Sequence, residues 1–286
     1  MTSGSAVSSG FAAAIGEHRR IMVAGRNVDV LLPPGPADVA RPLLLAHDGQ
    51  NVFEPGFSFG GVPWGVDVAL KALVDCDIIN EAQMPMVIAP WNRDGFGRAA
   101  DYAPERFVRA NPQALAGFEE FYDRIDWCGD EYVRWCADDL LPLANNLGYE
   151  IDPHNIAVMG SSMGGLASAY ALALRPDIYS TALCLSTHWP PGGHELVRQM
   201  IDALPNPQIG ARMWFDHGDQ GLDASYGEFQ ATADARMRER GYVEGSQWHS
   251  EFFLGTDHNE QSWAARLPQV LAWWLDGSSE RAVKWD

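Results

Sequence analysis

The stretch from Asn155 to Tyr170, NIAVMGSSMGGLASAY, constrains the fold of this chain more than any other part of it. It has the pattern of a short apolar strand, a turn of small residues and a helix of small residues. The turn has the spacing G-x-S-x-G, with Ser162 at its centre. A serine at such a strand-to-helix turn exposes its hydroxyl, and the helix N-terminus beside it favours negative charge. The pattern therefore predicts a nucleophilic Ser162, with a purely structural glycine-rich turn as the alternative.

The same order of strand and helix recurs along the chain. Alternation of this kind predicts an α/β protein with a mainly parallel central sheet and helices on both faces. We expect strands at Pro42–Ala46, Met84–Ala89, Ile156–Met159, Thr181–Leu185, Arg212–Phe215 and Gln247–Leu254, after two strands within Arg20–Pro34 that join near Gly25. We expect helices at Val66–Val74, Gly165–Arg175, His194–Leu204, Glu228–Arg240 and Ser262–Leu275, and a longer one over Phe118–Asn146 with breaks near Gly129 and Pro142.

Two stretches lack this periodicity. Residues 52–65 and 90–117 carry glycine and proline turn signals, and we expect irregular loops there. No linker or internal repeat divides the sequence, so we expect a single domain over residues 1–286. Residues 1 to about 18 form its flexible N-terminal segment in this interpretation.

Charge and cysteine content restrict the partners and the compartment. The formal net charge is −18, which disfavours binding to nucleic acid or to an anionic membrane surface. No apolar run approaches the ~20 residues of a membrane span. The four cysteines form no C-x-x-C pair, so we expect buried or half-buried free thiols and a cytoplasmic location. The sequence leaves homo-oligomer formation open.

A serine hydroxyl needs a base, normally a histidine that a carboxylate orients. In this kind of fold the chain order is serine, acid, histidine. His188 comes too early for that order, and His249 lies within an expected strand. His258 lies in the last loop before the final helix, 258 − 162 = 96 residues after the serine. We therefore predict His258 as the base.

The acid should follow the Arg212–Phe215 strand, where three aspartates lie. Asp216 ends the strand, Asp219 follows a glycine at once, and Asp223 has four more residues of loop with which to reach His258. We predict Asp223, with Asp219 as the second candidate. An acid from elsewhere, such as Glu260, or a Ser–His dyad remains open.

The transition state of acyl transfer carries an oxyanion that needs preorganised donors. One donor should be the backbone N–H of Met163, directly after the serine. The backbone N–H of Gln50, in the H-D-G-Q-N stretch after an early buried strand, should be the other. We expect no cofactor and no catalytic metal, because His47 and His217 lie near aspartates but in no H-x-x-H or H-E-x-x-H spacing.

Four stretches in this order, HDGQNVF, GSSMGGL, FDHGDQGLD and DHNEQSW, resemble the putative esterase family of the α/β-hydrolase superfamily. That family is similar to enterochelin esterases, feruloyl esterases, S-formylglutathione hydrolases (esterase D) and mycolyltransferases. The resemblance runs from about Leu43 to Leu275. It implies an α/β-hydrolase fold and ester hydrolysis. It matches the family's serine to Ser162, its histidine to His258 and its oxyanion turn to Asp48-Gly49, with Gln50 as the donor.

The expected function is thus that of a serine carboxylic-ester hydrolase that forms an acyl-enzyme with a small-molecule, sugar, siderophore or aryl ester. Alternatives are an acyltransferase that uses the same site and a non-catalytic binding protein on a hydrolase scaffold. Trp91 and Trp189 are candidate substrate-binding residues, and Trp64 lies in a similar loop. Core packing is the equally good interpretation of each tryptophan.

Overall fold

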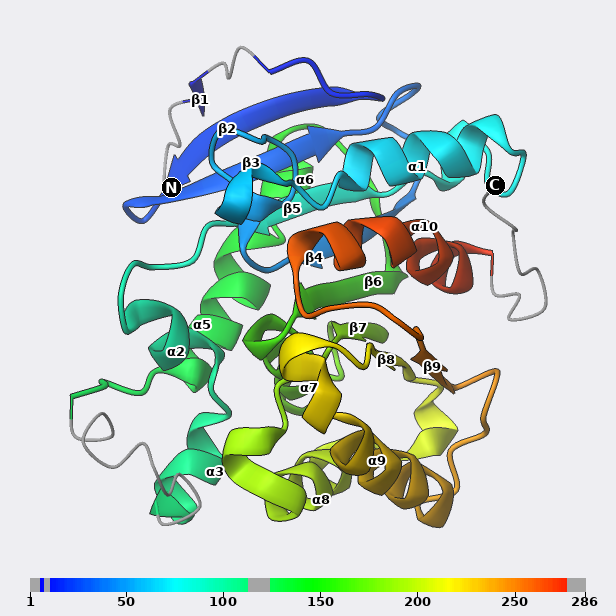
Figure 1. Cartoon of the computed structure of the whole chain (residues 1–286). Helices are drawn as coiled ribbons and strands as arrows, with labels where there is room; N and C mark the ends of the chain where they lie inside the picture. The colour runs from blue at the N-terminus through cyan, green and yellow to red at the C-terminus, as the bar shows by residue number, and fades with distance from the viewer. Residues whose placement is uncertain (1–5, 8–10, 113–123, 277–286) are drawn as a thin grey trace. The chain divides into compact units, whose positions relative to one another are not determined.

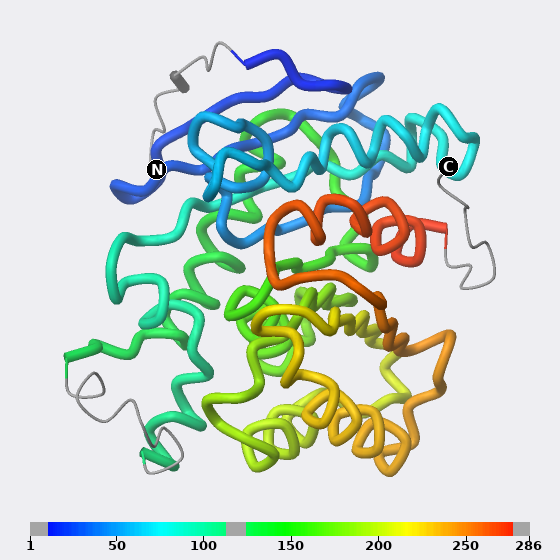
Figure 2. Tube along the Cα trace, in the orientation of Figure 1, coloured from blue at the N-terminus to red at the C-terminus, as the bar shows by residue number. Residues whose placement is uncertain are grey.

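The structure is a computed structural model and describes residues 6–7, 11–112 and 124–276. Contacts between Cα atoms group the chain into two compact units. Unit 1 comprises Met1–Trp91, Leu140–Ala157 and Asn259–Asp286, and unit 2 comprises Asn92–Asp139 and Val158–His258. Figure 2 follows this path: the blue and cyan segments belong to unit 1, and the yellow segments belong to unit 2. A single domain over residues 1–286 stays a prediction.

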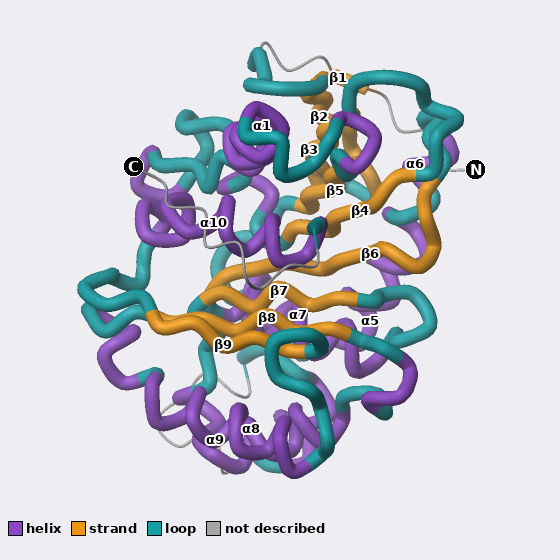
Figure 3. Tube along the Cα trace, turned by 90° about the vertical axis from the view of Figure 1, so that its right-hand side faces the viewer, coloured by secondary structure: helices purple, strands orange, loops and turns teal. Residues whose placement is uncertain are grey.

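The strands form two hydrogen-bonded series, one in each unit (Figures 1 and 3). The order in unit 1 is β1-β2-β3-β5-β4-β6 and that in unit 2 is β6-β7-β8-β9, because β6 begins in unit 1 and ends in unit 2. The bounds are Ala6–Val7 for β1, Glu17–Val23 for β2, Arg26–Leu32 for β3, Arg41–Ala46 for β4, Met86–Pro90 for β5, Ile151–Ser161 for β6, Thr181–Leu185 for β7, Arg212–His217 for β8 and Trp248–Phe252 for β9.

The helices flank these strands. In unit 1, α1 packs against α10, and in unit 2, α7 packs on β7 while α8 packs against α9. The bounds are Val66–Asp75 for α1, Gly97–Tyr102 for α2, Glu105–Ala110 for α3, Gly129–Trp135 for α5, Leu143–Asn146 for α6, Met163–Leu174 for α7, Gly193–Ala203 for α8, Gly227–Glu239 for α9 and Glu260–Leu275 for α10.

Unit 1 begins with antiparallel pairs. β2 and β3 join at Ala24 and Gly25, which both have positive φ, as a tight hairpin turn requires. β3 is antiparallel to β5, and β4 is parallel to β5. The leucines at 43, 44 and 45 have no exposed surface, so β4 is a fully buried central strand, as its continuous apolar run predicts.

In unit 2, β7, β8 and β9 are parallel neighbours. Leu185 pairs with Asp216, and Asp216 pairs with Glu251. Parallel strands end at the same edge of a sheet, so the segments that follow β7, β8 and β9 emerge together. These segments carry His188, Asp223 and His258. The prediction of an α/β protein with a mainly parallel sheet is confirmed.

Two sequence expectations are wrong in part. Residues 90–117 are not one irregular loop, because α2 and α3 lie within their described part. The helix expected to start at Phe118 falls partly on residues 113–123, outside the described residues, and residues 124–128 are not helical. α5 begins at Gly129, where a Cβ would lie 2.3 Å from the carbonyl oxygen of Ala103. The expected break at Pro142 is confirmed, since α6 begins after it.

The expected flexible segment, residues 1–18, lies partly outside the described residues. Of its described part, Ala6–Val7 pairs with β2, and the Ala14 N–H donates to the Asp67 carboxylate at 2.7 Å. All four cysteines are free thiols, and the expectation that they are buried or half-buried is wrong for Cys76, which is exposed. None of the helices in the described ranges has the length and apolar character needed to cross a bilayer.

Candidate active site

Ser162 occupies a strained turn between β6, which ends at Ser161, and α7, which begins at Met163. Its backbone has φ 56° and ψ −121°, a region that costs of order 1–3 kcal/mol for a residue with a side chain. Hydrogen bonds hold this conformation: its N–H donates to the Leu185 carbonyl at 2.8 Å, and its carbonyl accepts from the His188 N–H at 3.1 Å. The strand-turn-helix context that the G-x-S-x-G spacing predicts is therefore present.

The glycines of the turn permit close backbone packing. A Cβ at Gly160 would lie 2.5 Å from the carbonyl carbon of Gly164, and a Cβ at Gly165 would lie 3.1 Å from the Leu185 carbonyl oxygen. No side chain fits at the first position without moving backbone. The turn can therefore bring the start of α7 close to β7, which fixes the Met163 N–H beside the Ser162 side chain.

His258 and Asp223 form a short, shielded pair. The His258 Nδ1 lies 2.6 Å from Asp223 Oδ1, and the two side chains are 7% and 0% exposed. Asp223 Oδ2 accepts from the Ser186 hydroxyl and from the Gly218 N–H, each at 2.7 Å. Burial alone would raise the pKa of Asp223, but hydrogen bonds, chiefly that from His258, hold it below its usual value. A carboxylate in this state can orient the imidazole and stabilise its charged form.

The other candidate acids have different partners. Asp219 Oδ1 accepts from the Gly255 N–H at 2.7 Å and from Gln220. Buried Asp216 accepts from the Ser186 N–H and from the indole N–H of Trp214. These contacts are those of residues that hold loops and strand ends. The structure thus brings Asp223, and not Asp219 or Asp216, onto His258, while the catalytic roles stay predictions.

Tyr226 and His188 join this cluster, and the sequence reasoning did not find them. The Tyr226 hydroxyl is hydrogen-bonded to His188 Nδ1, and the Ser162 side chain lies near enough to it to influence its pKa. Its ring meets that of His258 edge-on, with centroids 5.3 Å apart. Tyr226 lies three residues after Asp223 and His188 three residues after β7 ends. Each follows an expected strand, and the sequence gives no further signal, because the structure alone shows that β7 and β8 are neighbours.

His188 is neutral at ordinary pH. Burial, and then the nearby His258 and Arg98, lower its pKa to about 4. Burial also raises the pKa of Tyr226 well above its usual value, so the phenol keeps its proton. The Arg98 guanidinium stacks over Tyr102 and lies 3.5 Å from the Ser161 carbonyl oxygen. The Tyr226–His188 pair near Ser162 therefore carries no net charge.

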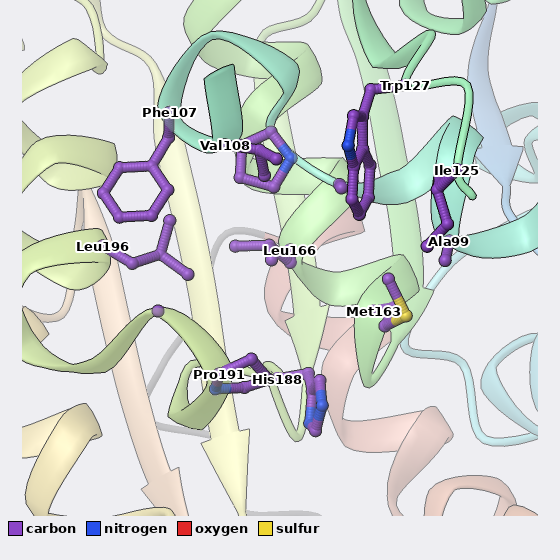
Figure 4. A pocket seen from close by; sticks show the side chains of 13 residues that line it. Ala99, Phe107, Val108, Ile125, Trp127, Met163, Leu166, His188, Pro191 and Leu196 are labelled. Atoms are coloured by element: carbon purple, nitrogen blue, oxygen red, sulfur yellow. The ribbon is translucent and has the colours of Figure 1, made fainter. Parts of the chain in front are cut away.

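A cavity of about 140 Å³ lies beside this cluster, wholly within unit 2 (Figure 4). Its walls come from α2, α3, α7 and α8, from the segment before α5 and from the segment after β7. The lining residues are Ala99, Ala103, Pro104, Phe107, Val108, Ile125, Trp127, Met163, Leu166, His188, Pro191, Gly192 and Leu196.

The predicted second oxyanion donor belongs to unit 1. Gln50 lies in a 3-10 turn, Gly49–Asn51, that follows β4 and begins after Asp48 in the left-handed conformation. A Cβ at Gly49 would lie only 2.0 Å from the Ala89 carbonyl oxygen, so glycine is required there. Gln50 is half-buried. Its role as a donor beside Met163 stays a prediction.

The tryptophans chosen as substrate-binding candidates have other surroundings. Trp189 is 1% exposed, donates to Gln230 and packs against Phe215, so it lies in the core of unit 2. Trp91 packs against the Arg20 guanidinium and Phe57 in unit 1. Trp64 is 2% exposed and packs edge-on against Trp263. Trp127, which was not a candidate, lines the cavity.

One group of metal-ligating side chains occurs among the described residues, namely His18, Asp29 and Glu54. The Arg20 guanidinium already binds both carboxylates, at 2.7 Å each. A permanent cation there competes with a metal ion for the same oxygen atoms. His47 and His217 belong to no such group; His217 Nδ1 contacts the Gly218 carbonyl oxygen at 2.7 Å.

Solved structures share this fold. The enterobactin esterase FES from Shigella flexneri matches with a TM-score of 0.64 and 16% identity over 92% of this chain, which spans 60% of that protein. An IroE-like serine hydrolase from Shewanella oneidensis matches with a TM-score of 0.64 and 15% identity, over 90% of this chain and 79% of that one. A ferulic acid esterase matches with a TM-score of 0.56 and 15% identity, over 95% of this chain and 98% of that one. At these identities the likeness establishes the α/β-hydrolase fold.

Among curated proteins, none matches this chain. A family model does match, over residues 21–274, and its description is putative esterase. This range includes the Ser162 turn, the Asp223–His258 pair and the Gln50 turn. The chain belongs to the putative esterase family.

Proposed function

We propose that this protein is a serine carboxylic-ester hydrolase that works through an acyl-enzyme. The proposal rests on two features of unit 2: a strained turn that carries Ser162, and a buried histidine–carboxylate pair. Tyr226 lies near both, since the Ser162 side chain influences the pKa of its hydroxyl and its ring meets that of His258 edge-on. A serine of this kind with a histidine oriented through Nδ1 is the arrangement that acyl transfer needs.

In the proposed mechanism, Ser162 Oγ attacks the ester carbonyl carbon while His258 Nε2 takes the hydroxyl proton. Asp223 holds the Nδ1 proton and stabilises the imidazolium that forms. The N–H groups of Met163 and Gln50 hold the oxyanion. His258 then gives the proton to the leaving alcohol. In the second half, water attacks the acyl-enzyme with His258 again as base, which releases the acid and restores Ser162.

Membership of an esterase family supports this reaction, and the names of the similar structures suggest siderophore or aryl esters as substrates. Transfer of the acyl group to an alcohol or a sugar would use the same residues. Product analysis with and without an alcohol acceptor separates hydrolysis from transfer. A non-catalytic binding protein on this scaffold is the remaining alternative. A cytoplasmic location stays a prediction that rests on the four free thiols.

The test is hydrolysis of p-nitrophenyl acetate and butyrate by the protein and two serine variants. We expect Ser162→Ala to lower kcat by on the order of 10⁶, as loss of a triad nucleophile does. Its neighbour Ser161, 2% exposed, provides the matched control, and Ser161→Ala should keep most of the activity. Thermal unfolding of each variant verifies the fold. Near-native turnover by folded Ser162→Ala would refute the proposal.

A further inference from the structure

The cavity in unit 2 lies next to the turn that carries Ser162. Met163, whose side chain enters the cavity in Figure 4, directly follows Ser162. His188, also in the lining, is hydrogen-bonded to Tyr226, whose hydroxyl lies near the Ser162 side chain. An acyl group carried on Ser162 Oγ therefore has this cavity beside it.

The described lining is apolar. Aliphatic and aromatic side chains form it, among them Phe107, Val108, Leu166 and Leu196, with Trp127 on another side. The titratable side chain in this lining is His188, and its low pKa keeps it uncharged. No charged partner for a carboxylate or an ammonium stands in this part of the wall. A charged group would lose its hydration there without compensation, which is strongly unfavourable.

Nearby arginines are directed elsewhere. Arg98 stacks over Tyr102 and reaches the Ser161 carbonyl oxygen. On α3, Arg106 pairs with Asp130 at 2.8 Å, and Arg109 pairs with Glu105 at 2.7 Å. None of these three arginines is among the described residues that line the cavity.

The volume sets the size of the occupant. The cavity measures about 140 Å³, close to the ~150 Å³ of an engineered apolar cavity that binds benzene. A six-carbon group fits such a space. A much longer chain would have to leave it or displace its walls.

We propose that this cavity is the acyl-binding pocket of the enzyme, and that it selects an uncharged acyl group of about the size of benzoyl or hexanoyl. The inference rests on the proposed ester hydrolysis and adds the substrate class. It places the acyl group, and not the alcohol, next to Met163, Leu166 and His188.

The first test compares p-nitrophenyl esters of one alcohol and different acids: acetate, butyrate, hexanoate, decanoate, benzoate and hemisuccinate. We expect kcat/KM to rise by up to about fourfold per methylene from acetate to hexanoate, the factor for burial of one CH₂. It should fall again at decanoate, and benzoate should rank with hexanoate. Hemisuccinate, which adds a carboxylate to a four-carbon acid, should lie at least about tenfold below butyrate.

The second test changes the walls. Ala99 is a half-buried residue of α2. Ala99→Leu should fill the cavity and lower the ratio of kcat/KM for hexanoate to that for acetate by about tenfold. Leu196→Ala should enlarge it and shift the best acyl chain to more carbons. Matched controls are Ala72→Leu in α1 and Leu204→Ala at the end of α8, neither of which lines the cavity. The ratio of two substrates within one variant does not depend on how much of it folds.

The outcomes separate the two proposals. Hydrolysis of acetate with no chain-length preference, or with preference for hemisuccinate, would overturn the pocket assignment and leave the esterase proposal standing. Equal ratios in the wall variants and in their controls would also overturn it. Hydrolysis of none of these esters, together with no labelling of Ser162 by a fluorophosphonate, would overturn the esterase proposal and the pocket with it.

Discussion

Each unit of this protein contains a buried histidine–aspartate pair, and the two pairs have different surroundings. In unit 1, His18 Nε2 lies 3.5 Å from Asp29 Oδ2. In unit 2, His258 Nδ1 lies 2.6 Å from Asp223 Oδ1. Both carboxylates are at most 1% exposed. In both cases burial alone would raise the carboxyl pKa, and hydrogen bonds lower it instead. The direction of the pKa shift therefore does not distinguish the pairs.

The partners of the carboxylates distinguish them. Asp29 holds the Arg20 guanidinium through two hydrogen bonds of 2.7 and 3.0 Å, and Glu54 binds the same guanidinium. Arg20 also stacks on the rings of Phe57 and Trp91, each with its centroid 4.5 Å away. In unit 2, the further donors to Asp223 are neutral: the Ser186 hydroxyl and the Gly218 N–H.

This contrast separates a structural pair from one suited to catalysis. In unit 1 the Arg20 guanidinium ties together the carboxylates of Asp29 and Glu54, as in a structural ion-pair cluster. Asp223 retains its charge for His258, whose neighbour Tyr226 contacts Ser162. The account therefore assigns proton transfer to the pair in unit 2 and fold stability to the pair in unit 1.

The largest expected effect concerns Asp223. Asp223→Asn should lower kcat by about 10⁴, because the imidazole loses the carboxylate that fixes its tautomer and stabilises its charge. Asp219→Asn, in the same loop, is the matched control and should cost under about tenfold, since Asp219 binds the Gly255 N–H. Steady-state kinetics on p-nitrophenyl butyrate measures both. The reverse pattern would move the acid to Asp219.

A smaller effect, on stability, should follow from Arg20→Ala in unit 1. Removal of the guanidinium leaves buried Asp29 without its cation and should lower the free energy of unfolding by about 3 kcal/mol. The kcat per folded molecule should stay near the wild-type value. Urea unfolding measures the loss, with Arg19→Ala as the control from the same strand, because Arg19 forms an exposed pair with Glu17. A large loss of kcat with intact stability would contradict the assignment of a structural role to the pair in unit 1.

The smallest expected effect comes from His188. Its folded-state pKa is lowered to about 4, below the ~6.5 of an unfolded chain. As pH falls, the unfolded chain takes up the proton first, so stability is lost between about pH 6.5 and 4. Between pH 7 and 4.5 this loss should be about 2 kcal/mol. Urea unfolding at the two pH values should therefore show a smaller difference for His188→Gln than for the wild type. His154 is exposed, and the control variant His154→Gln should show the same difference between the two pH values as the wild type.

Much of the fold could be predicted from the sequence. The strand Thr181–Leu185 was located to the residue, because an apolar run between two serines has clear ends. The six-residue helices α2 and α3 were missed, because segments this short show no periodicity among their glycines and prolines. The start of α5 depends on the close approach of Gly129 to Ala103, which is a tertiary contact.

The candidate residues that follow a fixed order along the chain could be proposed from the sequence. Those whose contacts depend on which strands are neighbours could not. The order serine, acid, histidine was enough to propose His258 and Asp223, which the structure places 2.6 Å apart. His188 was set aside because of its early position. Its contact with Tyr226 depends on β7 lying next to β8 in parallel register, and sequence spacing does not give that pairing.

The most direct test of the central claim is covalent labelling of the whole protein with a fluorophosphonate, followed by peptide mass mapping. The account predicts one phosphonylated residue, Ser162, with labelling abolished in Ser162→Ala, retained in Ser161→Ala and slowed strongly in His258→Ala. Label on Ser161, or no label on a preparation that hydrolyses esters, would contradict the assignment of Ser162 as the nucleophile.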